Sequence, residues 1–254
     1  MIAEGIPSIE NICFPEILVE RFVESEGGLV LVAGATGSGK STSIAAMLQE
    51  SARRKAFRVV SIEDPIEYRF EDTEIGSIFT QRQLGRDATD YISALKRALR
   101  MNPDVIFVGE IRNPHVAEIV IEAASTGHRV LTTIHGGDPI TAIRRLLSMA
   151  AGAGMTDPGE NFADCIQAVI AQKLLTFGAD HPRVAIHEIL TRTQAVVSRI
   201  RQGEISRLFG EIETGRNAGM ISFALSMEKR KEEGKIPEES DEDEVSEQEE
   251  EIEE

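Results

Sequence analysis

The fold is decided by one stretch near the start of the sequence, GLVLVAGATGSGKS at residues 28–41. Its first six residues form a continuous apolar run, which is typical of a strand buried on both faces of a parallel sheet. The next eight match the pattern G-x-x-x-x-G-K-[ST], and a helical pattern follows from Lys40 to about Lys55. A strand, a glycine-rich turn and a helix in this order predict a loop that binds phosphate groups.

The residue types of this loop explain the prediction. Glycine permits backbone angles that point successive N–H groups into one concavity, and the following helix N-terminus adds partial positive charge. In that arrangement Lys40 reaches the β- and γ-phosphates of a nucleotide, and the Ser41 hydroxyl takes one Mg²⁺ position. The expected nucleotide-binding residues are Gly34, Ala35, Thr36, Gly37, Ser38, Gly39, Lys40, Ser41 and Thr42.

Strand and helix patterns alternate after the loop. Buried strands are predicted over 57–62, 104–108 and 129–134, with helices over 88–101 and 114–125. This order predicts a doubly wound α/β domain with a mainly parallel sheet. Beyond Asp138 the predicted elements are helices over 140–149 and 162–172, a strand over 183–190, and helices over 193–202, 206–214 and 222–233.

The negative charge of the chain is concentrated at its end. The 254 residues carry 43 acidic and 27 basic side chains, a net charge of −16, but 12 of the acids lie in residues 238–254. The remainder is close to neutral, which gives little support to a direct nucleic-acid binder. We predict a nucleotide-binding α/β core over 1–190, a helical C-terminal subregion over 191–236 and a disordered acidic tail over 237–254. The tail either solubilises the chain or has a docking or autoinhibitory role against a basic partner or a neighbouring subunit.

Cysteine usage and hydropathy indicate the compartment. Cys13 and Cys165 are the only cysteines, too few for a disulfide framework or a zinc pattern. No apolar run approaches the roughly 18 residues of a membrane span, and the first residues lack a secretory signal. We therefore expect a cytoplasmic protein that reaches the inner membrane, if at all, through partners.

Hydrolysis at a γ-phosphate needs one carboxylate to orient or deprotonate water and another to order Mg²⁺. Two predicted strand ends supply acids, Glu63 and Glu110. Ligands of open α/β sheets lie beyond the carboxyl ends of the strands, so both are candidate catalytic residues and candidate metal contacts through water. The sequence leaves open which of the two activates water.

Together the motifs resemble those of the type II/type IV secretion ATPase family (GspE/PilT-like), and in particular its pilus-retraction branch. The matching residues are 6–10, 34–42, 62–68, 81–85, 98–100, 103–112 and 124–135. The resemblance implies a RecA-like P-loop NTPase domain with a Walker A loop, an aspartate box, a histidine box and an atypical Walker B motif. In this last motif Gly109 stands where other P-loop enzymes carry a metal-binding Asp.

The resemblance further implies an Mg²⁺-dependent ATPase that forms a ring, typically a hexamer, and powers a type IV pilus (retraction and twitching motility) or a related secretion machine. ATP and Mg²⁺ would be its cofactors, and an inner-membrane platform protein its partner. Carried over residue by residue, Lys40, Glu63 and Glu110 are catalytic. The candidates for phosphate sensing, subunit contacts or supporting ion pairs are His128, His135, Arg82, Arg100 and Arg112.

The sequence also departs from the family pattern. The family's N-terminal domain, which contributes arginines to a neighbour's nucleotide site, is missing before Gly34, so we expect the isolated chain to be a weak ATPase. Residues 195–202 match the retraction motif only in part. Two alternatives stay open: an ATP-binding adaptor or partner-dependent subunit with negligible turnover alone, and an ATPase of a conjugation or effector-secretion system. The direction of force, transported substrate and ring size are not predicted.

Overall fold

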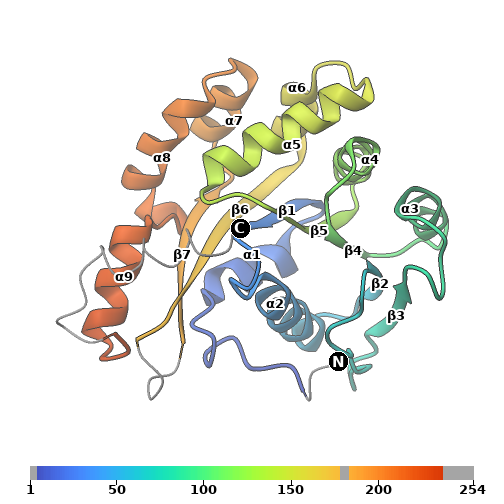
Figure 1. Cartoon of the computed structure of the whole chain (residues 1–254), viewed down its shortest axis with the longest axis horizontal. Helices are drawn as coiled ribbons and strands as arrows, with labels where there is room; N and C mark the ends of the chain where they lie inside the picture. The colour runs from blue at the N-terminus through green and yellow to red at the C-terminus, as the bar shows by residue number, and fades with distance from the viewer. Residues whose placement is uncertain (1–4, 178–182, 237–254) are drawn as a thin grey trace, which may run out of the picture.

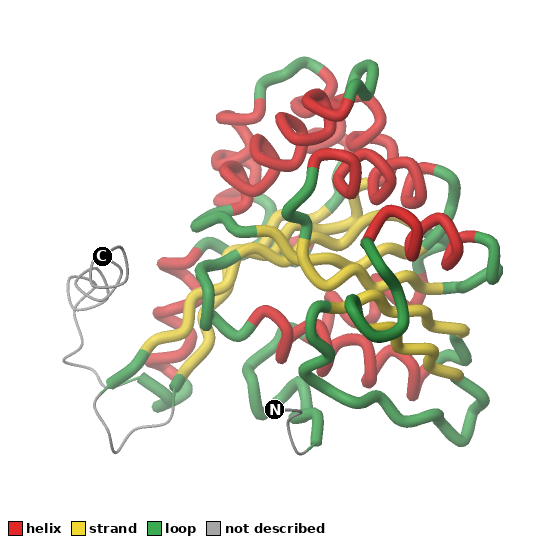
Figure 2. The backbone as a smooth tube through the Cα atoms, turned by 45° about the vertical axis from the view of Figure 1, so that its right-hand side comes forward, coloured by secondary structure: helices red, strands yellow, loops and turns green. Residues whose placement is uncertain are grey.

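A seven-stranded sheet with the order β3-β2-β4-β5-β1-β6-β7 runs through the computed structural model, which describes residues 5–177 and 183–236 (Figures 1 and 2). The strands are β1 (Gly28–Ala33), β2 (Arg58–Glu63), β3 (Ile78–Gln83), β4 (Val105–Glu110), β5 (Arg129–Ile134), β6 (Ile166–Leu175) and β7 (Val184–Thr191). Every neighbouring pair is parallel except β6 and β7. The predicted α/β fold with a mainly parallel sheet is confirmed. The predicted tail over 237–254 lies outside the described residues.

Helices cover both faces of the sheet (Figure 1). They are α1 (Glu16–Glu24), α2 (Lys40–Arg54), α3 (Tyr91–Leu99), α4 (Pro114–Ser125), α5 (Pro139–Ala153), α6 (Pro158–Cys165), α7 (Gln194–Arg201), α8 (Leu208–Thr214) and α9 (Phe223–Glu232), with short 3₁₀ turns at Ile205–Arg207 and Arg216–Ala218. One buried apolar cluster packs α1 and α2 against one face of the sheet. A second cluster packs the helices from α3 through α8 against the opposite face. Helix α9 packs beside β7. No helix of the described ranges is long and apolar enough to cross a membrane.

Capping residues fix where three of these helices begin. Asp90, Asn113 and Asp138 each accept a hydrogen bond from a backbone N–H in the first turn of α3, α4 and α5. Pro114 and Pro139 stand at the first positions of α4 and α5, where the missing N–H would have no helical partner anyway. Because α4 and α5 follow parallel strands, their N-termini lie at the carboxyl edge of the sheet.

The predicted helix over 162–172 is wrong. Helix α6 ends at Cys165, and β6 begins at the next residue and inserts between β1 and β7. Four consecutive residues of β6, 168–171, are buried, so the run has no polar face. A short apolar run of this kind does not reveal by its period whether it is a helix or a strand. Helix α1 and the edge strand β3, most of which is half-exposed, were not predicted.

Candidate nucleotide site

A cleft of about 230 Å³ lies at the carboxyl ends of four adjacent strands, β2, β4, β5 and β1. It collects the predicted phosphate loop and the predicted acids in one place. Its lining comprises Thr36, Gly37, Gly39, Lys40 and Ser41 from the loop, the acids Glu63, Asp64, Glu67 and Glu110, and Pro65, Tyr91, Phe107, Gly109, Arg112 and Thr133.

The loop has glycine where other residues would not fit. Gly37 and Gly39 have φ of +82° and +84°, in the left-handed region that L-residues with a Cβ rarely adopt. At Gly34 the limit is space, because a Cβ there would lie 2.6 Å from the carbonyl oxygen of Gln172. The motif glycines therefore allow both the curvature of the loop and its close approach to β6.

Lys40 begins α2 and turns its ammonium group back over the loop. Its Nζ donates hydrogen bonds to the carbonyl oxygens of Gly34 (2.9 Å) and Ala35 (2.6 Å). Burial lowers the pKa of Lys40, and the carboxylates of Glu110 and Glu67 counteract this by raising it. The ammonium group thus stands at the mouth of a site whose other charged groups are mostly acidic.

Glu67 is a site residue that the sequence did not single out by itself. Its Oε1 accepts a hydrogen bond of 2.9 Å from the Ser41 hydroxyl, the group predicted to contact Mg²⁺. Thr42 and Tyr68, the residues that follow Ser41 and Glu67, also contact each other, with their hydroxyl oxygens 2.9 Å apart. The sequence signals for Glu67 were its place in the stretch 62–68, which resembles the family, and the two other acids of that stretch, Glu63 and Asp64.

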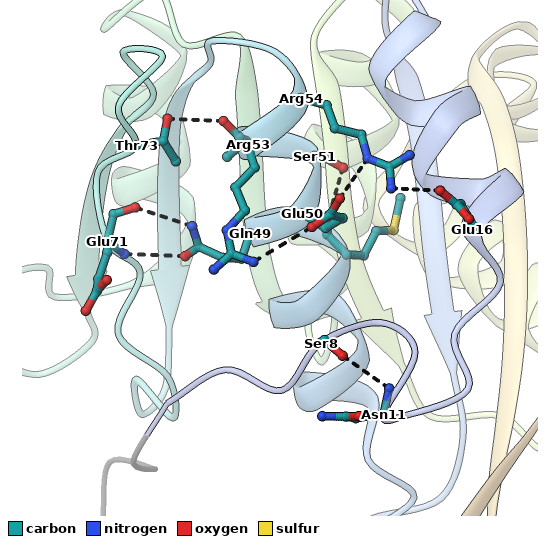
Figure 3. A network of polar contacts seen from close by, with 12 residues as sticks. Ser8, Asn11, Glu16, Gln49, Glu50, Ser51, Arg53, Arg54, Glu71 and Thr73 are labelled. Atoms are coloured by element: carbon teal, nitrogen blue, oxygen red, sulfur yellow. Dashed lines mark hydrogen bonds and ion pairs between the residues drawn. The ribbon is translucent and has the colours of Figure 1, made fainter.

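The segment that carries Glu67, between β2 and β3, is fastened along α2 (Figure 3). The side-chain amide of Gln49 contacts both backbone groups of Glu71, at 3.5 and 3.4 Å, and the Thr73 hydroxyl donates to Ala52 O. The same view shows Arg54 joining Glu50 of its own helix to Glu16 of α1. The contacts of Glu71 and Thr73 hold the segment along the second half of α2, and Glu67 meets the start of the same helix at Ser41.

The two predicted catalytic acids have different surroundings. Glu63 ends β2 and is 6% exposed, and its Oε1 accepts hydrogen bonds from Ser61 Oγ (2.5 Å) and Gln81 Nε2 (3.1 Å). Burial raises the pKa of Glu63, and these two neutral donors only partly counteract it. Glu110 ends β4, is half-buried and forms an ion pair with the exposed Arg112, whose pKa is raised by that bond. One acid is desolvated, and the other is charge-paired.

Gly109 allows three elements to meet beside these acids. A Cβ at this position would lie 3.3 Å from the hydroxyl of Tyr91 and 3.4 Å from the Cα of Glu63. The β4–β5 register also shifts here, and Thr133 Oγ1 donates to Gly109 O at 2.7 Å. An Asp would crowd this point. Burial, together with nearby acids, raises the pKa of Tyr91 to about 12, so its hydroxyl stays a proton donor at neutral pH.

The two histidines lie at opposite ends of β5. His135 follows the carboxyl end, near the cleft, and is exposed. His128 precedes the amino end, with its Nδ1 3.2 Å from Ala123 O, and a six-residue strand separates the two by about 20 Å. Of these two histidines, His135 is the one at the carboxyl edge of the sheet, although it does not line the cleft.

The predicted arginines are also divided. Arg112 lines the cleft, whereas Arg82 on β3 contacts Met101 Sδ, and Arg100 follows α3 as an exposed residue. Neither Arg82 nor Arg100 forms an ion pair within the described parts of the chain. The structure therefore brings together Lys40, Ser41, Glu63, Glu110 and Arg112, and leaves His128, Arg82 and Arg100 outside the cleft.

With this geometry in view, the chain matches the family described as "Type II/IV secretion system protein" over residues 15–239. The protein YggR of Escherichia coli (strain K12) is 38% identical over 231 residues, 91% of this chain and 69% of YggR. The type IV pilus retraction ATPase PilT of Pseudomonas aeruginosa is 33% identical over 249 residues, 93% of this chain and 71% of PilT. A crystal structure of the pilus retraction motor PilT with bound ADP has a TM-score of 0.83 at 32% identity, covering 94% of this chain and 67% of that one.

The chain spans 57–71% of the length of the four similar proteins that it matches over at least 87% of its own length. With these four, the similarity covers nearly all of this chain and about two thirds of the relative.

Proposed function

The chain belongs to the type II/IV secretion system protein family, and from that premise we propose that it is an Mg²⁺-dependent ATPase of a type IV pilus or a related secretion machine. The observation that carries this proposal is one cleft in which Lys40 and Ser41 of the phosphate loop face Glu63, Glu67 and Glu110. The similar proteins support it, because one is a type IV pilus retraction ATPase and the crystal structure of a PilT retraction motor contains ADP.

The loop and Lys40 would bind the phosphates. Backbone N–H groups of a left-handed glycine turn at a helix N-terminus form a site for anions. The Lys40 ammonium group, which already lies among carbonyl oxygens of the loop, adds a full positive charge. It compensates the phosphate charge beside the acidic side of the cleft.

The residues present fit a magnesium ion. Mg²⁺ prefers hard oxygen ligands, and the Ser41 hydroxyl and the carboxylates of Glu63, Glu67 and Glu110 are all of this kind. Within the described ranges, no three His, Cys, Asp or Glu side chains converge closely enough to hold a metal by themselves. The ion would therefore be shared with the nucleotide phosphates, and when bound it would neutralise charge on the phosphoryl oxygens.

Glu63 and Glu110 would supply the ionised groups that order the metal and the attacking water. Both functions need the carboxylate form, and the Glu110 carboxylate is paired with the Arg112 guanidinium. Tyr91, whose hydroxyl lies close to Gly109, adds a neutral donor to the same cleft. The division of roles between Glu63 and Glu110 stays open in this proposal.

Assembly is part of the same proposal. We propose a homo-oligomeric ring of six chains that acts on an inner-membrane platform protein from the cytoplasm, with no direct nucleic-acid contact. His128, Arg82 and Arg100, which lie outside the cleft, are candidates for contacts between subunits. The division into a core over 1–190, a subregion over 191–236 and a tail over 237–254 also remains a prediction.

One observation favours the second candidate, a subunit that binds ATP but depends on a partner for turnover. Among the described residues, Arg112 is the one arginine that lines the cleft, and its guanidinium is engaged by Glu110. An arginine supplied by a neighbour is worth about 10³–10⁵ in rate in other phosphoryl-transfer enzymes. We therefore expect the isolated chain to hydrolyse ATP slowly.

The test is phosphate release from ATP with and without Mg²⁺, for the wild-type chain, Lys40→Ala and a control at the other end of α2, Lys55→Ala. We expect slow Mg²⁺-dependent turnover that Lys40→Ala reduces about 100-fold or more, because a buried charge opposite the phosphates is lost, and that Lys55→Ala leaves unchanged. A Lys40→Ala variant as active as wild type would contradict the proposal. ATP binding without turnover, restored by adding a full-length relative, would favour the second candidate.

A further inference from the structure

Gln172 is a buried polar residue that reaches the phosphate loop from a distant part of the sequence. It lies on β6, the strand beside β1, and is 3% exposed. Its Nε2 donates a hydrogen bond of 2.7 Å to Ser38 O, and its Oε1 accepts one of 2.7 Å from Ser43 Oγ. One side-chain amide thus joins the loop to the first turn of α2.

The chemistry of the partners fixes which end of the amide faces which group. Ser38 O is a carbonyl oxygen and can only accept, so the NH₂ group of Gln172 must face it. The Ser43 hydroxyl can donate to the remaining amide oxygen. Ser43 therefore holds Gln172 in the orientation that grips the loop, and the bond to Ser38 O cannot be reversed.

The bond to Ser38 O orients the next N–H group. The peptide between Ser38 and Gly39 is planar and trans, so its C=O and N–H point in opposite directions. Because the carbonyl points at Gln172 on β6, the Gly39 N–H points away from β6, and Gly39 lines the cleft. A rotated peptide would present a carbonyl oxygen instead, which repels phosphate.

The contact is close enough to restrict the loop sequence. A Cβ on Gly39 would lie 2.9 Å from Gln172 Nε2, and one on Gly34 would lie 2.6 Å from Gln172 O. The side chain and backbone of a single β6 residue therefore contact both motif glycines that frame the loop. We propose that Gln172 is a positioning residue for nucleotide binding: it holds the Ser38–Gly39 peptide with its N–H toward the phosphates.

The chain contains a matched control on the same strand. Gln167 lies near the other end of β6, and its Nε2 donates a 2.8 Å hydrogen bond to another backbone carbonyl, Gly27 O. This bond is at the amino edge of the sheet, away from the cleft. Substitutions at Gln167 therefore reproduce the loss of a glutamine–carbonyl bond on β6 without touching the loop.

The inference deepens the proposed function and rests on it, so the experiment reads nucleotide binding directly. A fluorescent ADP analogue is titrated with Mg²⁺ into wild type, Gln172→Glu, Gln172→Met and Gln167→Glu from pH 5.5 to pH 9. The temperature is kept well below the Tm of the least stable variant. At high pH the carboxylate introduced by Gln172→Glu has no proton to donate to Ser38 O, and we expect the Kd of this variant to rise about 10- to 100-fold.

The pH profile separates positioning from packing. As pH falls, the introduced carboxyl group becomes protonated and can donate to Ser38 O again, so the defect of Gln172→Glu should shrink to a few-fold. Gln172→Met has no titratable group, and its defect should not change with pH. Gln167→Glu should bind like wild type throughout.

Each other outcome has a definite meaning. If wild type does not bind the analogue, the proposed function itself fails. If wild type binds and Gln172→Glu binds equally well at all pH values, or is weakened by a constant factor, the positioning proposal is overturned while nucleotide binding stands.

Discussion

The amino and carboxyl edges of the parallel sheet are formed by the two ends of the same strands, but their polar groups are arranged differently. At the amino edge, polar groups are paired within the protein. The buried Arg129 donates to Phe22 O and Ser25 O and lies 5.2 Å from the Phe57 ring, and Asp104 accepts from the backbone N–H of Arg58 at 2.8 Å.

At the carboxyl edge, polar groups converge on a cleft. Glu110 forms an ion pair with Arg112, Lys40 Nζ donates to two carbonyl oxygens of its own loop, and the hydroxyl of Tyr91 lies close to Gly109, the residue before Glu110. Groups that are paired internally stabilise the fold, because a buried donor or acceptor without a partner is costly. Groups that face a cleft can exchange their partners for a ligand. Substitutions at the amino edge should therefore change stability, and those at the carboxyl edge should change activity.

The largest effect is expected at Glu110, at the carboxyl end of β4, with Asp104 beside the amino end of the same strand as its control. Glu110→Gln removes a carboxylate from the cleft, and we expect the Mg²⁺-ATPase rate to fall about 10²–10⁴-fold, the usual value of a general acid–base group, with nucleotide binding retained. Asp104→Asn, at the amino end, keeps an acceptor for Arg58 N and should leave the rate unchanged. Steady-state kinetics on both variants make the comparison. Equal losses in the two would show that the edges do not differ as argued.

Thermal stability should show the converse pattern, with the larger effect at the amino edge. Arg129→Met leaves the carbonyl groups of Phe22 and Ser25 without their donor, so the free energy of unfolding should fall by about 1–3 kcal/mol. For a domain of this size the fall corresponds to a decrease in Tm of about 2–10 °C. Arg112→Met, at the carboxyl edge, removes an exposed guanidinium and should change Tm little. Thermal unfolding measures both, and a Tm loss that is larger for Arg112→Met would reverse the assignment of the two edges.

What the sequence predicted follows the same division. Strands β1 and β5 were predicted to the residue, and β1 is a continuous apolar run of the kind that marks a buried parallel strand. Glu63 and Glu110 followed from one rule, that parallel strands end at a common edge. Strand β6 could not be separated from a helix by its period, so its residues were misassigned. The wide separation of His128 and His135 was already implicit in the predicted strand between them.

The missing parts of the site depend on contacts between distant residues. Glu67 meets Ser41 across 26 positions, and Gln172 meets Ser38 across 134. Glu67 belongs to an acidic stretch but nothing local shows that it meets Ser41, and no local pattern marks Gln172, because the sequence did not determine the path of either segment. The loop itself was predictable from its own residues, whereas the groups that hold and complete it were not.

The smallest expected effect, a displaced pH profile, concerns Glu63. Burial raises the pKa of Glu63, and the hydrogen bond from Ser61 is the largest influence that lowers it again. Ser61→Ala should therefore raise this pKa further. If turnover needs the ionised carboxylate, the acidic limb of kcat moves to higher pH, while kcat at alkaline pH is nearly unchanged.

The stability of the fold should change with pH in the opposite direction to kcat. Because folding raises the pKa of the Glu63 carboxyl group, the folded state favours its protonated form. The folded state then loses stability as pH rises through that raised pKa, and Ser61→Ala should steepen the loss. Ser51→Ala is the control, since Ser51 is equally buried but bonds Met47 O within α2. The measurement is the pH profile of kcat at saturating Mg²⁺-ATP for wild type, Ser61→Ala and Ser51→Ala. Coincident acidic limbs for Ser61→Ala and wild type would mean that Glu63 does not control the rate, and the activity of the carboxyl edge would then rest on Glu110.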